Sequence, residues 1–394
     1  MTRQLPFPQP DPTAPPPEYA ELRATCPIAR VTTAEGAPAW LVTSYDAAGA
    51  VLGDTRFGMA PAGTATTLDP ASESSATTGN DTLFQDGATH TRLRRLVTKA
   101  FTPRAIEALR PLIEQRSAEL VDGMIARGRT ADLVEDLAAP LSTAVISELV
   151  GVRLADRNRF RELAETISTA ETAPEEAFGA WQELGAYSAG LIATKRDEPG
   201  EDLLSRLIAV RDDDNGRLSD EELIGMVATL VLAGYQTARN GICIAAIQLL
   251  RTGRLASLLT DEADAVLDEA LRLLGGAIGN PMPRWAHEDV EVAGTHIAKG
   301  DQVLVRLDAA NHDPAHFADP DEFRTDRKAL PHMSFGRGAH HCLGASLARA
   351  EIGIALRTLA ARLPGLSLSV PVTEIPWSPL TATDRGPESV PVSW

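Results

Sequence analysis

The segment FGRGAHHCLG, residues 335–344, combines one cysteine with three glycines and two histidines directly before a helical pattern. Glycine allows the backbone to approach another group closely and adopts φ values that other residues avoid. A cysteine at the amino end of a helix is favoured as a thiolate, because helix-end amides stabilise negative charge. The pattern predicts a loop that presents Cys342 to a large flat cofactor, and the alternative is a buried, inert cysteine in a turn.

Three further segments carry side chains that suit a charged or reactive site. His90 and Arg94 are four residues apart and so share one face of a predicted helix, which suits either binding of a carboxylate or a solvated basic surface. Glu269 and Arg272 are three residues apart and can form an ion pair within a helix. Thr237 lies inside a long apolar stretch, where its hydroxyl either bonds its own helix or faces a reacting group.

One long helix must run through the centre of the fold. Ser219 and Glu222 have the spacing of a capping box, which predicts a helix that begins there and ends near Leu250. At 1.5 Å per residue its length is roughly 48 Å. It is apolar on almost all sides, which is typical of a membrane span or of the buried axis of a large domain. The residues that interrupt the apolar surface favour the buried axis, and they are Gly234, Gln236, Thr237, Arg239 and Asn240.

The rest of the chain predicts helices with a few short strands. Residues 1–16 are rich in proline and predict an extended arm, and residues 17–394 predict a single domain. Residues 57–89 lack periodicity and predict a long loop. Helical periodicity covers 90–210, 261–274 and about 343–363, and strand patterns cover 40–43, 290–294 and 302–307. The expected fold class is mainly α with a minor β part.

Composition argues against several functions and locations. The formal net charge of −17 over 394 residues disfavours nucleic acid as a partner, because binding phosphates needs a basic surface. The three cysteines, Cys26, Cys243 and Cys342, do not form a disulfide framework and suit a reducing compartment. The sequence shows no signal-peptide pattern and no apolar run of about 20 residues. We therefore expect a cytoplasmic monomer with no membrane anchor.

With these residues in place, the sequence resembles the cytochrome P450 family. The heme-binding loop of that family reads Phe-x-x-Gly-x-His/Arg-x-Cys-x-Gly, and Phe335, Gly338, His340, Cys342 and Gly344 match it. The resemblance covers roughly residues 15–394, with the motifs in order. It implies the P450 fold, in which a long central helix lies over the heme and the Cys loop lies beneath it. It also implies heme b (iron protoporphyrin IX) as the cofactor.

The resemblance assigns roles on the proximal side of the heme. Cys342 would be the thiolate ligand of the iron, the kind of ligand that favours O–O cleavage. Glu269 and Arg272 match the family's Glu-x-x-Arg motif, and with Arg327 they would brace the Cys loop. The residues expected to bind the heme itself, including its propionates, are His90, Arg94, Arg284, Phe335, Gly336, His340 and Gly344.

On the opposite side, AGYQT at 233–237 resembles the family's oxygen-binding groove. The resemblance implies catalytic roles for Ala233, Gly234, Gln236 and Thr237. Gly234 would leave room over the iron, and the Thr237 hydroxyl would hydrogen-bond dioxygen. Gln236 stands where the family usually has a carboxylate that passes protons, and an amide cannot act as an acid or base, although it can orient water. This departure suggests chemistry other than plain hydroxylation.

Electrons must come from another protein, because the chain has no flavin, nicotinamide or iron–sulfur fingerprint. The resemblance implies ferredoxin and ferredoxin reductase as partners. An acidic ferredoxin would be steered by a basic surface on the proximal face. The alternative is a set of merely solvated charges. The residues predicted to form this surface are Arg92, Arg95, Lys99, Arg337 and Arg349.

The expected substrate is a small, partly polar natural product, as for family members that tailor secondary metabolites. The expected reaction is hydroxylation or oxidative C–C or C–N coupling, with a cyclic dipeptide as one candidate substrate. Two rivals remain open: a peroxide-driven peroxygenase, and a non-catalytic heme module that recruits a carrier-bound substrate. The residues expected to line the substrate pocket are Thr66, Thr82, Leu230, Ala233, Asn280 and Met282.

Overall fold

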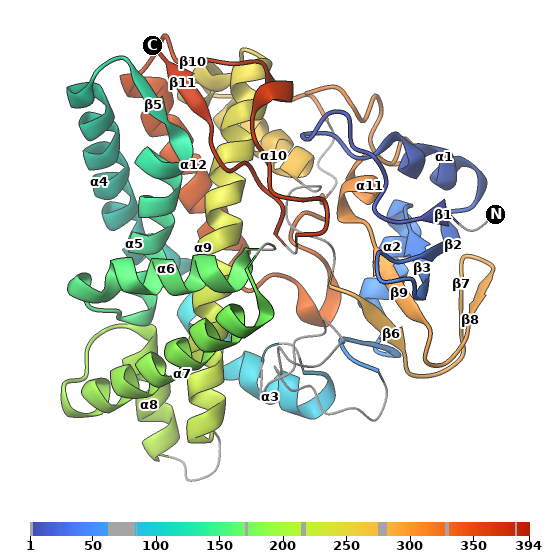
Figure 1. Ribbon diagram of the computed structural model, residues 1–394, viewed down its shortest axis with the longest axis horizontal. Helices are drawn as coiled ribbons and strands as arrows, with labels where there is room; N and C mark the ends of the chain where they lie inside the picture. The colour runs from blue at the N-terminus through green and yellow to red at the C-terminus, as the bar shows by residue number, and fades with distance from the viewer. Residues whose placement is uncertain are drawn as a thin grey trace.

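A single long helix, α9 (Asp220–Arg251), runs through the helical part of the molecule (Figure 1). The computed structural model describes residues 3–61, 83, 85–169, 172–213, 218–274, 282–327, 331–382 and 384–394. The capping box is confirmed, because Ser219 Oγ accepts from the Glu222 amide at 3.0 Å and the Glu222 carboxylate accepts from the Ser219 amide at 2.9 Å. Most of its side chains between Leu223 and Leu249 are buried. Among the described helices, none is long and apolar enough to cross a membrane.

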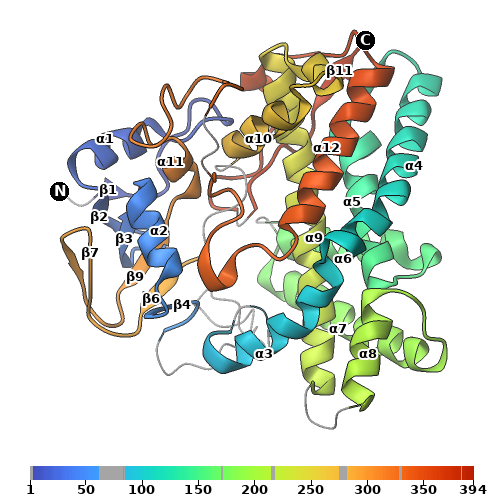
Figure 2. The same cartoon turned by 180° about the vertical axis from the view of Figure 1, so that it is seen from behind.

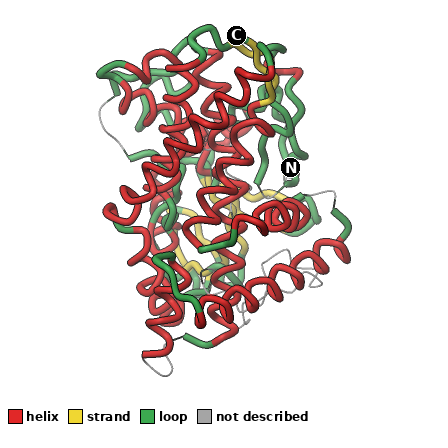
Figure 3. The backbone as a smooth tube through the Cα atoms, turned by 90° about the vertical axis from the view of Figure 1, so that its left-hand side faces the viewer, coloured by secondary structure: helices red, strands yellow, loops and turns green. Residues whose placement is uncertain are grey.

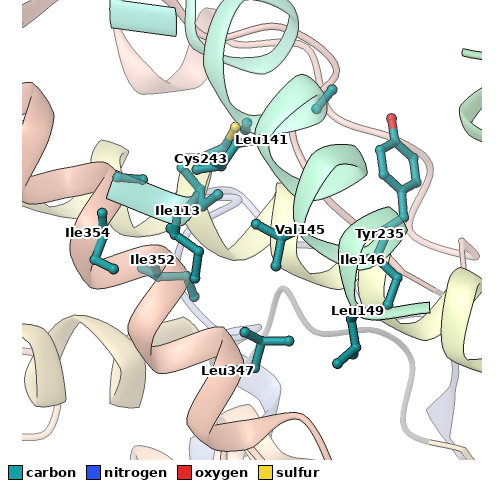
Figure 4. Packing of buried hydrophobic residues seen from close by; sticks show 14 of the residues in the cluster. Ile113, Leu141, Val145, Ile146, Leu149, Tyr235, Cys243, Leu347, Ile352 and Ile354 are labelled. Carbon is teal, nitrogen blue, oxygen red and sulfur yellow. The ribbon is translucent and has the colours of Figure 1, made fainter. Parts of the chain in front are cut away.

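Other helices surround α9, and together they bury the main hydrophobic core (Figures 1 and 3). Figure 4 shows Ile113, Val145, Cys243 and Ile352 meeting there from four different helices. Burial of each such aliphatic side chain contributes roughly 1.5–3 kcal/mol. The helices that form this layer are α3 (Gly87–Thr98), α4 (Pro103–Arg127), α5 (Ala139–Val150), α6 (Arg157–Ser168), α7 (Pro174–Asp197), α8 (Leu203–Asp213), α10 (Ala263–Leu273) and α12 (Ala345–Arg362).

A six-stranded sheet lies on the other side of the molecule, with strand order β1-β2-β3-β9-β6-β4 (Figure 1). β2 and β3 are antiparallel, with Ile28 opposite Val42, and β3 and β9 are parallel, with Trp40 opposite Val303. Three helices accompany it: α1 (Pro17–Thr25), α2 (Tyr45–Gly53) and α11 (Leu307–Asn311). The strands are β1 (Arg3–Gln4), β2 (Ile28–Thr32), β3 (Pro38–Val42), β4 (Phe57–Gly58), β6 (Arg284–Ala286) and β9 (Gln302–Val305).

Two smaller sheets complete the β part. One joins β5 (Thr130–Asp132), β10 (Ser367–Leu368) and β11 (Pro391–Ser393), and the other is the hairpin β7 (Val290–Val292) and β8 (Thr295–Ile297). The strand predicted at 290–294 is therefore too long. Ala293 and Gly294 have positive φ values of 48° and 75°, so they form the turn of the hairpin. The P450-type architecture, mainly α with a minor β part, is as expected.

The loop that carries Cys342 lies between α11 and α12 in sequence and between the sheet side and the helical side in space. Figure 2 shows this segment descending to the start of α12, with α3 below it. Both halves of the fold therefore contribute to the surroundings of Cys342.

Candidate cofactor site

Backbone geometry shapes the Cys loop. The Cys342 amide donates to the Phe335 carbonyl at 2.8 Å, which closes the loop on itself. Gly336 and Gly338 have φ values of 71° and 77°, which favour glycine. A Cβ on Gly338 would also lie 2.0 Å from the Leu52 carbonyl oxygen of α2. Gly344 has an ordinary φ of −84°, so no unusual φ explains glycine there; an added Cβ would lie 4.0 Å from Cys342 Sγ.

The Cys342 side chain is exposed, yet it lies deep enough in the protein that loss of hydration raises the pKa of the thiol. The Gly344 amide and the charge of Arg94 lower that pKa, as predicted for groups near a helix end, but desolvation is the larger effect. The expectation of a lowered pKa is therefore wrong for the free thiol. A deep and accessible sulfur is well placed to bind a metal centre.

Two histidines pack against each other near this loop. The rings of His90 and His340 lie 4.2 Å apart, and His340 Nε2 is 3.1 Å from a carboxylate oxygen of Asp86. The other Asp86 oxygen accepts from the Met59 amide at 2.7 Å. Burial, with the nearby charges of His340 and Arg94, lowers the pKa of His90 to about 4. Its Nε2 is buried and has no hydrogen-bond partner among the described residues.

Arg284 is a half-buried cation with no counter-ion among the described residues. Within that part of the chain, its guanidinium donates to the carbonyls of Met282, at 3.0 Å, and Pro283, at 3.3 Å. Within the described part of the chain, no carboxylate lies within ion-pair distance, and burial lowers its pKa to about 10. Arg94 donates to the carbonyl of His341, beside the Cys342 sulfur. The half-buried guanidinium of Arg284 and the imidazole nitrogen of His90, neither of which has a charged partner among the described residues, fit a cofactor that carries carboxylates, such as heme.

Glu269, Arg272 and Arg327 form the expected network. Arg272 binds both Glu269 oxygens at 2.8 and 2.9 Å, and Arg327 Nε donates to Glu269 at 2.9 Å. Arg272 also donates to the Asn311 carbonyl at 2.6 Å. The Asn311 side chain in turn accepts from the Met333 amide at 2.6 Å, so the network reaches the start of the Cys loop. Sequence reasoning missed Asn311, because its partners lie far away in the chain.

The middle of α9 holds the residues predicted for catalysis. Ala233 is exposed although its helix is the buried axis, so the surface of α9 is accessible at this point. Thr237 is half-buried, and its hydroxyl donates to the Ala233 carbonyl at 2.6 Å. Gln236 is half-buried. Arg239 points to the C-terminal segment, where it donates to the Pro387 carbonyl at 3.3 Å.

The structure gives Gly234 a close neighbour that the motif did not predict. A Cβ on Gly234 would lie 2.5 Å from Ile146 Cδ1, so the glycine makes room for α5. The next residue, Tyr235, faces α6, because its buried hydroxyl donates to Glu165 of that helix. Figure 4 shows Ile146 and Tyr235 side by side at this contact. A sequence pattern places a glycine on a helix but does not show which neighbour the helix meets there.

The basic surface is smaller than expected. Arg92 is ion-paired with Glu222, and Arg349 with Asp268, so these two charges are largely neutralised. The exposed cations that remain without an ion pair among the described residues are Arg95, Lys99 and Arg337. A cleft of about 520 Å³ adjoins them, and it is lined by His90, Thr91, Arg94, Arg95, Thr98, Lys99, Thr102 and Ala339.

Only some of the residues expected to line the substrate pocket belong to the described part of the chain. Thr66, Thr82 and Asn280 lie outside the described residues. Leu230 is buried within the core, Met282 is half-buried beside Arg284, and Ala233 is exposed. Of this set, Ala233 is placed best to meet a ligand.

Known proteins share this fold and much of this sequence. The cytochrome P450 family model matches residues 26–184 and 180–363. Mycinamicin IV hydroxylase/epoxidase of Micromonospora griseorubida is 41% identical over 380 residues, which cover 95% of this chain and 94% of the relative. The structure of the LnmA cytochrome P450 hydroxylase from the leinamycin pathway of Streptomyces atroolivaceus superposes with a TM-score of 0.88, at 38% identity and full coverage of both chains. A cytochrome P450mel with biaryl coupling reactivity gives a TM-score of 0.88 at 35% identity, also over both chains in full.

A mainly α fold with a deep cysteine beside unpaired cationic groups defines a class of heme-binding oxidoreductases. The chain belongs to the cytochrome P450 family. Its cofactor is heme b, and it is a heme-dependent enzyme of the monooxygenase type. Bacterial members generally receive electrons from ferredoxin and reductase partners and act on small substrates.

Proposed function

We propose that this P450 enzyme tailors a mid-sized natural product with dioxygen and with electrons from a ferredoxin and its reductase. The observation that carries the proposal is that two reactive parts of the protein are both accessible, one on the Cys loop and one on α9. One is the deep thiol of Cys342, and the other is the stretch of α9 with Ala233 exposed and the Thr237 hydroxyl beside it. The relative that hydroxylates or epoxidises mycinamicin IV supports a substrate of this class.

The proximal residues hold the cofactor in this proposal. Cys342 Sγ binds the iron, and the backbone of Phe335, Gly336 and Gly344 shapes the loop around it. Arg284, His340, His90 and Arg94 bind the two propionates, which would give Arg284 the counter-ion that the described residues do not supply. Glu269, Arg272 and Arg327 keep the loop in place through Asn311. Heme bound in this way supplies the centre for oxygen activation.

On the distal side, the Thr237 hydroxyl uses its proton to bond the Ala233 carbonyl, so its oxygen is free to accept a hydrogen bond. Thr237 can therefore hold a water molecule or a ligand OH. The Gln236 amide can orient such a water but cannot deliver a proton itself. Protons must then arrive through water, which favours reactions that need fewer delivered protons. Oxidative coupling is the second candidate, and the structural neighbour with biaryl coupling reactivity supports it.

The remaining surface supports docking of a small acidic electron carrier. Arg95 and Lys99 on α3 and the following turn, with Arg337 of the Cys loop, leave exposed positive charge near the proximal side of an acidic protein. Such a surface steers an acidic partner.

The N-terminal arm, residues 1–16, is proposed to act with residues 17–394 as one unit. Its contacts with α9 support this, since Arg251 binds Asp11 at 2.6 Å and Gln248 donates to the Thr13 carbonyl at 3.1 Å.

The carbonyl spectrum of the reduced, heme-loaded protein tests thiolate ligation. We expect a strongly red-shifted Soret band that is lost in Cys342→His. Turnover with ferredoxin, reductase and NADPH then tests the reaction class. Product that forms only with these donors supports the proposal, product that forms with peroxide alone supports a peroxygenase, and no product with either indicates a non-catalytic heme module. Arg239, which binds the Pro387 carbonyl, is not placed to hold a fatty-acid carboxylate for peroxide-driven chemistry.

A further inference from the structure

The C-terminal segment 377–387 folds back onto α9 close to the predicted catalytic residues. Trp377 pairs with Pro387 across the segment, and the side chain of Asn240 donates to the Asp384 carbonyl at 3.1 Å. Gly386 packs so closely on Asn240 that a Cβ there would lie 2.2 Å from it. Figure 1 shows this segment running down along α9 towards the centre of the molecule. Asn240 is three residues beyond Thr237, so the residue that holds the Asp384 backbone lies about one helical turn along α9 from Thr237.

The Asp384 carboxyl is deep and yet accessible, like the Cys342 thiol. Its residue is only half-buried, but loss of hydration raises its pKa to about 6, and no charged group among the described residues offsets this effect. Through its hydrogen bond from Asn240, Asp384 lies beside the middle of α9, where Ala233 is exposed and Thr237 is half-buried.

Other buried carboxylates of this protein have partners. Asp308 binds Arg306 at 2.8 Å, Glu269 binds two arginines, and Glu351 accepts from the Ser142 hydroxyl at 2.9 Å. In the described part of the chain, the Asp384 carboxyl has no hydrogen bond or ion pair, although its backbone is bonded to Asn240. An unpaired carboxyl inside a protein costs stability, so a ligand that pairs with it would bind favourably.

We propose that Asp384 is a specificity residue that binds a cationic amine of the substrate. An alkylammonium group would find there a carboxylate that no cation in the described part of the chain already neutralises. Because water is partly excluded, the attraction would be stronger than at the outer surface. The substrate class is therefore a natural product with a basic nitrogen, placed near the reacting end of the pocket. This inference rests on the proposed function only in treating the space beside α9 as the substrate pocket.

A pair of equally shaped probes isolates the charge. (4-Hydroxyphenyl)trimethylammonium and 4-tert-butylphenol have the same shape, differ in one positive charge, and have no free amine to ligate iron. Equilibrium dialysis with ferric, heme-loaded protein measures both affinities without turnover. We expect wild-type protein to bind the ammonium probe about tenfold or more tightly than the neutral one, as a charge-assisted contact provides.

Two variants then assign the preference to Asp384. Asp384→Asn should remove this preference, and Glu388→Gln, which neutralises an exposed carboxylate directly after the segment, should keep it. Asp384→Glu retains the negative charge and should keep at least part of the preference for the ammonium probe. This variant keeps the proposal testable if the Asn variant does not load heme. Equal affinity for both probes in wild-type protein, or an unchanged preference in Asp384→Asn, would overturn the proposal. Failure of the proposed function would appear instead in the carbonyl spectrum, which the dialysis does not use.

Discussion

The contact between Gly234 and Ile146 makes a sharp test of how α9 is packed. An added Cβ on Gly234 would lie 2.5 Å from Cδ1, 2.9 Å from Cγ1 and 3.4 Å from Cβ of Ile146, which is buried. Such overpacking costs about 1–3 kcal/mol. Alanine is better than glycine inside a helix by about 1 kcal/mol, so Gly234→Ala should destabilise the protein by about 0–2 kcal/mol net.

A second substitution should reverse the sign. Ile146→Ala removes Cδ1 and Cγ1, the two atoms in conflict, and costs about 2–5 kcal/mol by itself. In that background, Gly234→Ala should stabilise the protein by about 1 kcal/mol, so the two substitutions should be coupled by roughly 1–3 kcal/mol. Urea unfolding of heme-loaded protein, followed by circular dichroism, measures each step of the cycle.

Gly190 on α7 provides the control, because it is an exposed helical glycine with nothing within 4 Å of an added Cβ. Gly190→Ala should stabilise the protein by about 0.5–1 kcal/mol in either background. If Gly234→Ala is equally destabilising in the wild-type and in the Ile146→Ala background, the contact with α5 does not explain the glycine. Gly234→Ala that leaves stability intact but weakens ligand binding would restore the view that Gly234 makes room in the pocket.

Further outcomes follow from single contacts. Glu269→Gln leaves the buried Arg272 and Arg327 without their carboxylate, so it should cost about 3–5 kcal/mol, measured by urea unfolding; a loss below about 1 kcal/mol would contradict the bracing role. Arg284→Met should speed heme loss to a scavenger apoprotein at least tenfold, whereas Arg110→Met, on the surface of α4, should not. Between pH 4 and 6, Asp384 binds more protons in the folded than in the unfolded state, so the free energy of unfolding falls as pH rises through that window. Asp384→Asn should therefore be more stable than wild type at pH 8 by about 1–3 kcal/mol but not at pH 4. A stability difference that is the same at both pH values would contradict the raised pKa of Asp384. Arg95→Glu should slow reduction by ferredoxin several-fold at low salt, and the difference should shrink at high salt; salt-independent rates would exclude steering.

Features that depend on neighbours in the chain were predictable. The start of α9 follows from Ser219 and Glu222, because a capping box needs only four consecutive residues. The ion pair of Glu269 and Arg272 follows from their spacing on one helix. The loop around Cys342 was predictable for the same reason, because Gly336 and Gly338 hold positive φ values within a ten-residue segment. The predictions of the cofactor and of the P450 fold came from the resemblance to the family.

Features that depend on packing between distant segments were decided only by the tertiary structure. Gly234 meets Ile146, nearly ninety positions earlier, so its purpose could not be seen in the motif around it. Arg92 is neutralised by Glu222, which removes it from the predicted basic surface. The carboxyl of Asp384 reaches the α9 region only because the C-terminal segment folds back onto Asn240. The sequence by itself therefore determined the enzyme class, through local motifs, whereas the contacts that shape the distal pocket needed the whole chain in place.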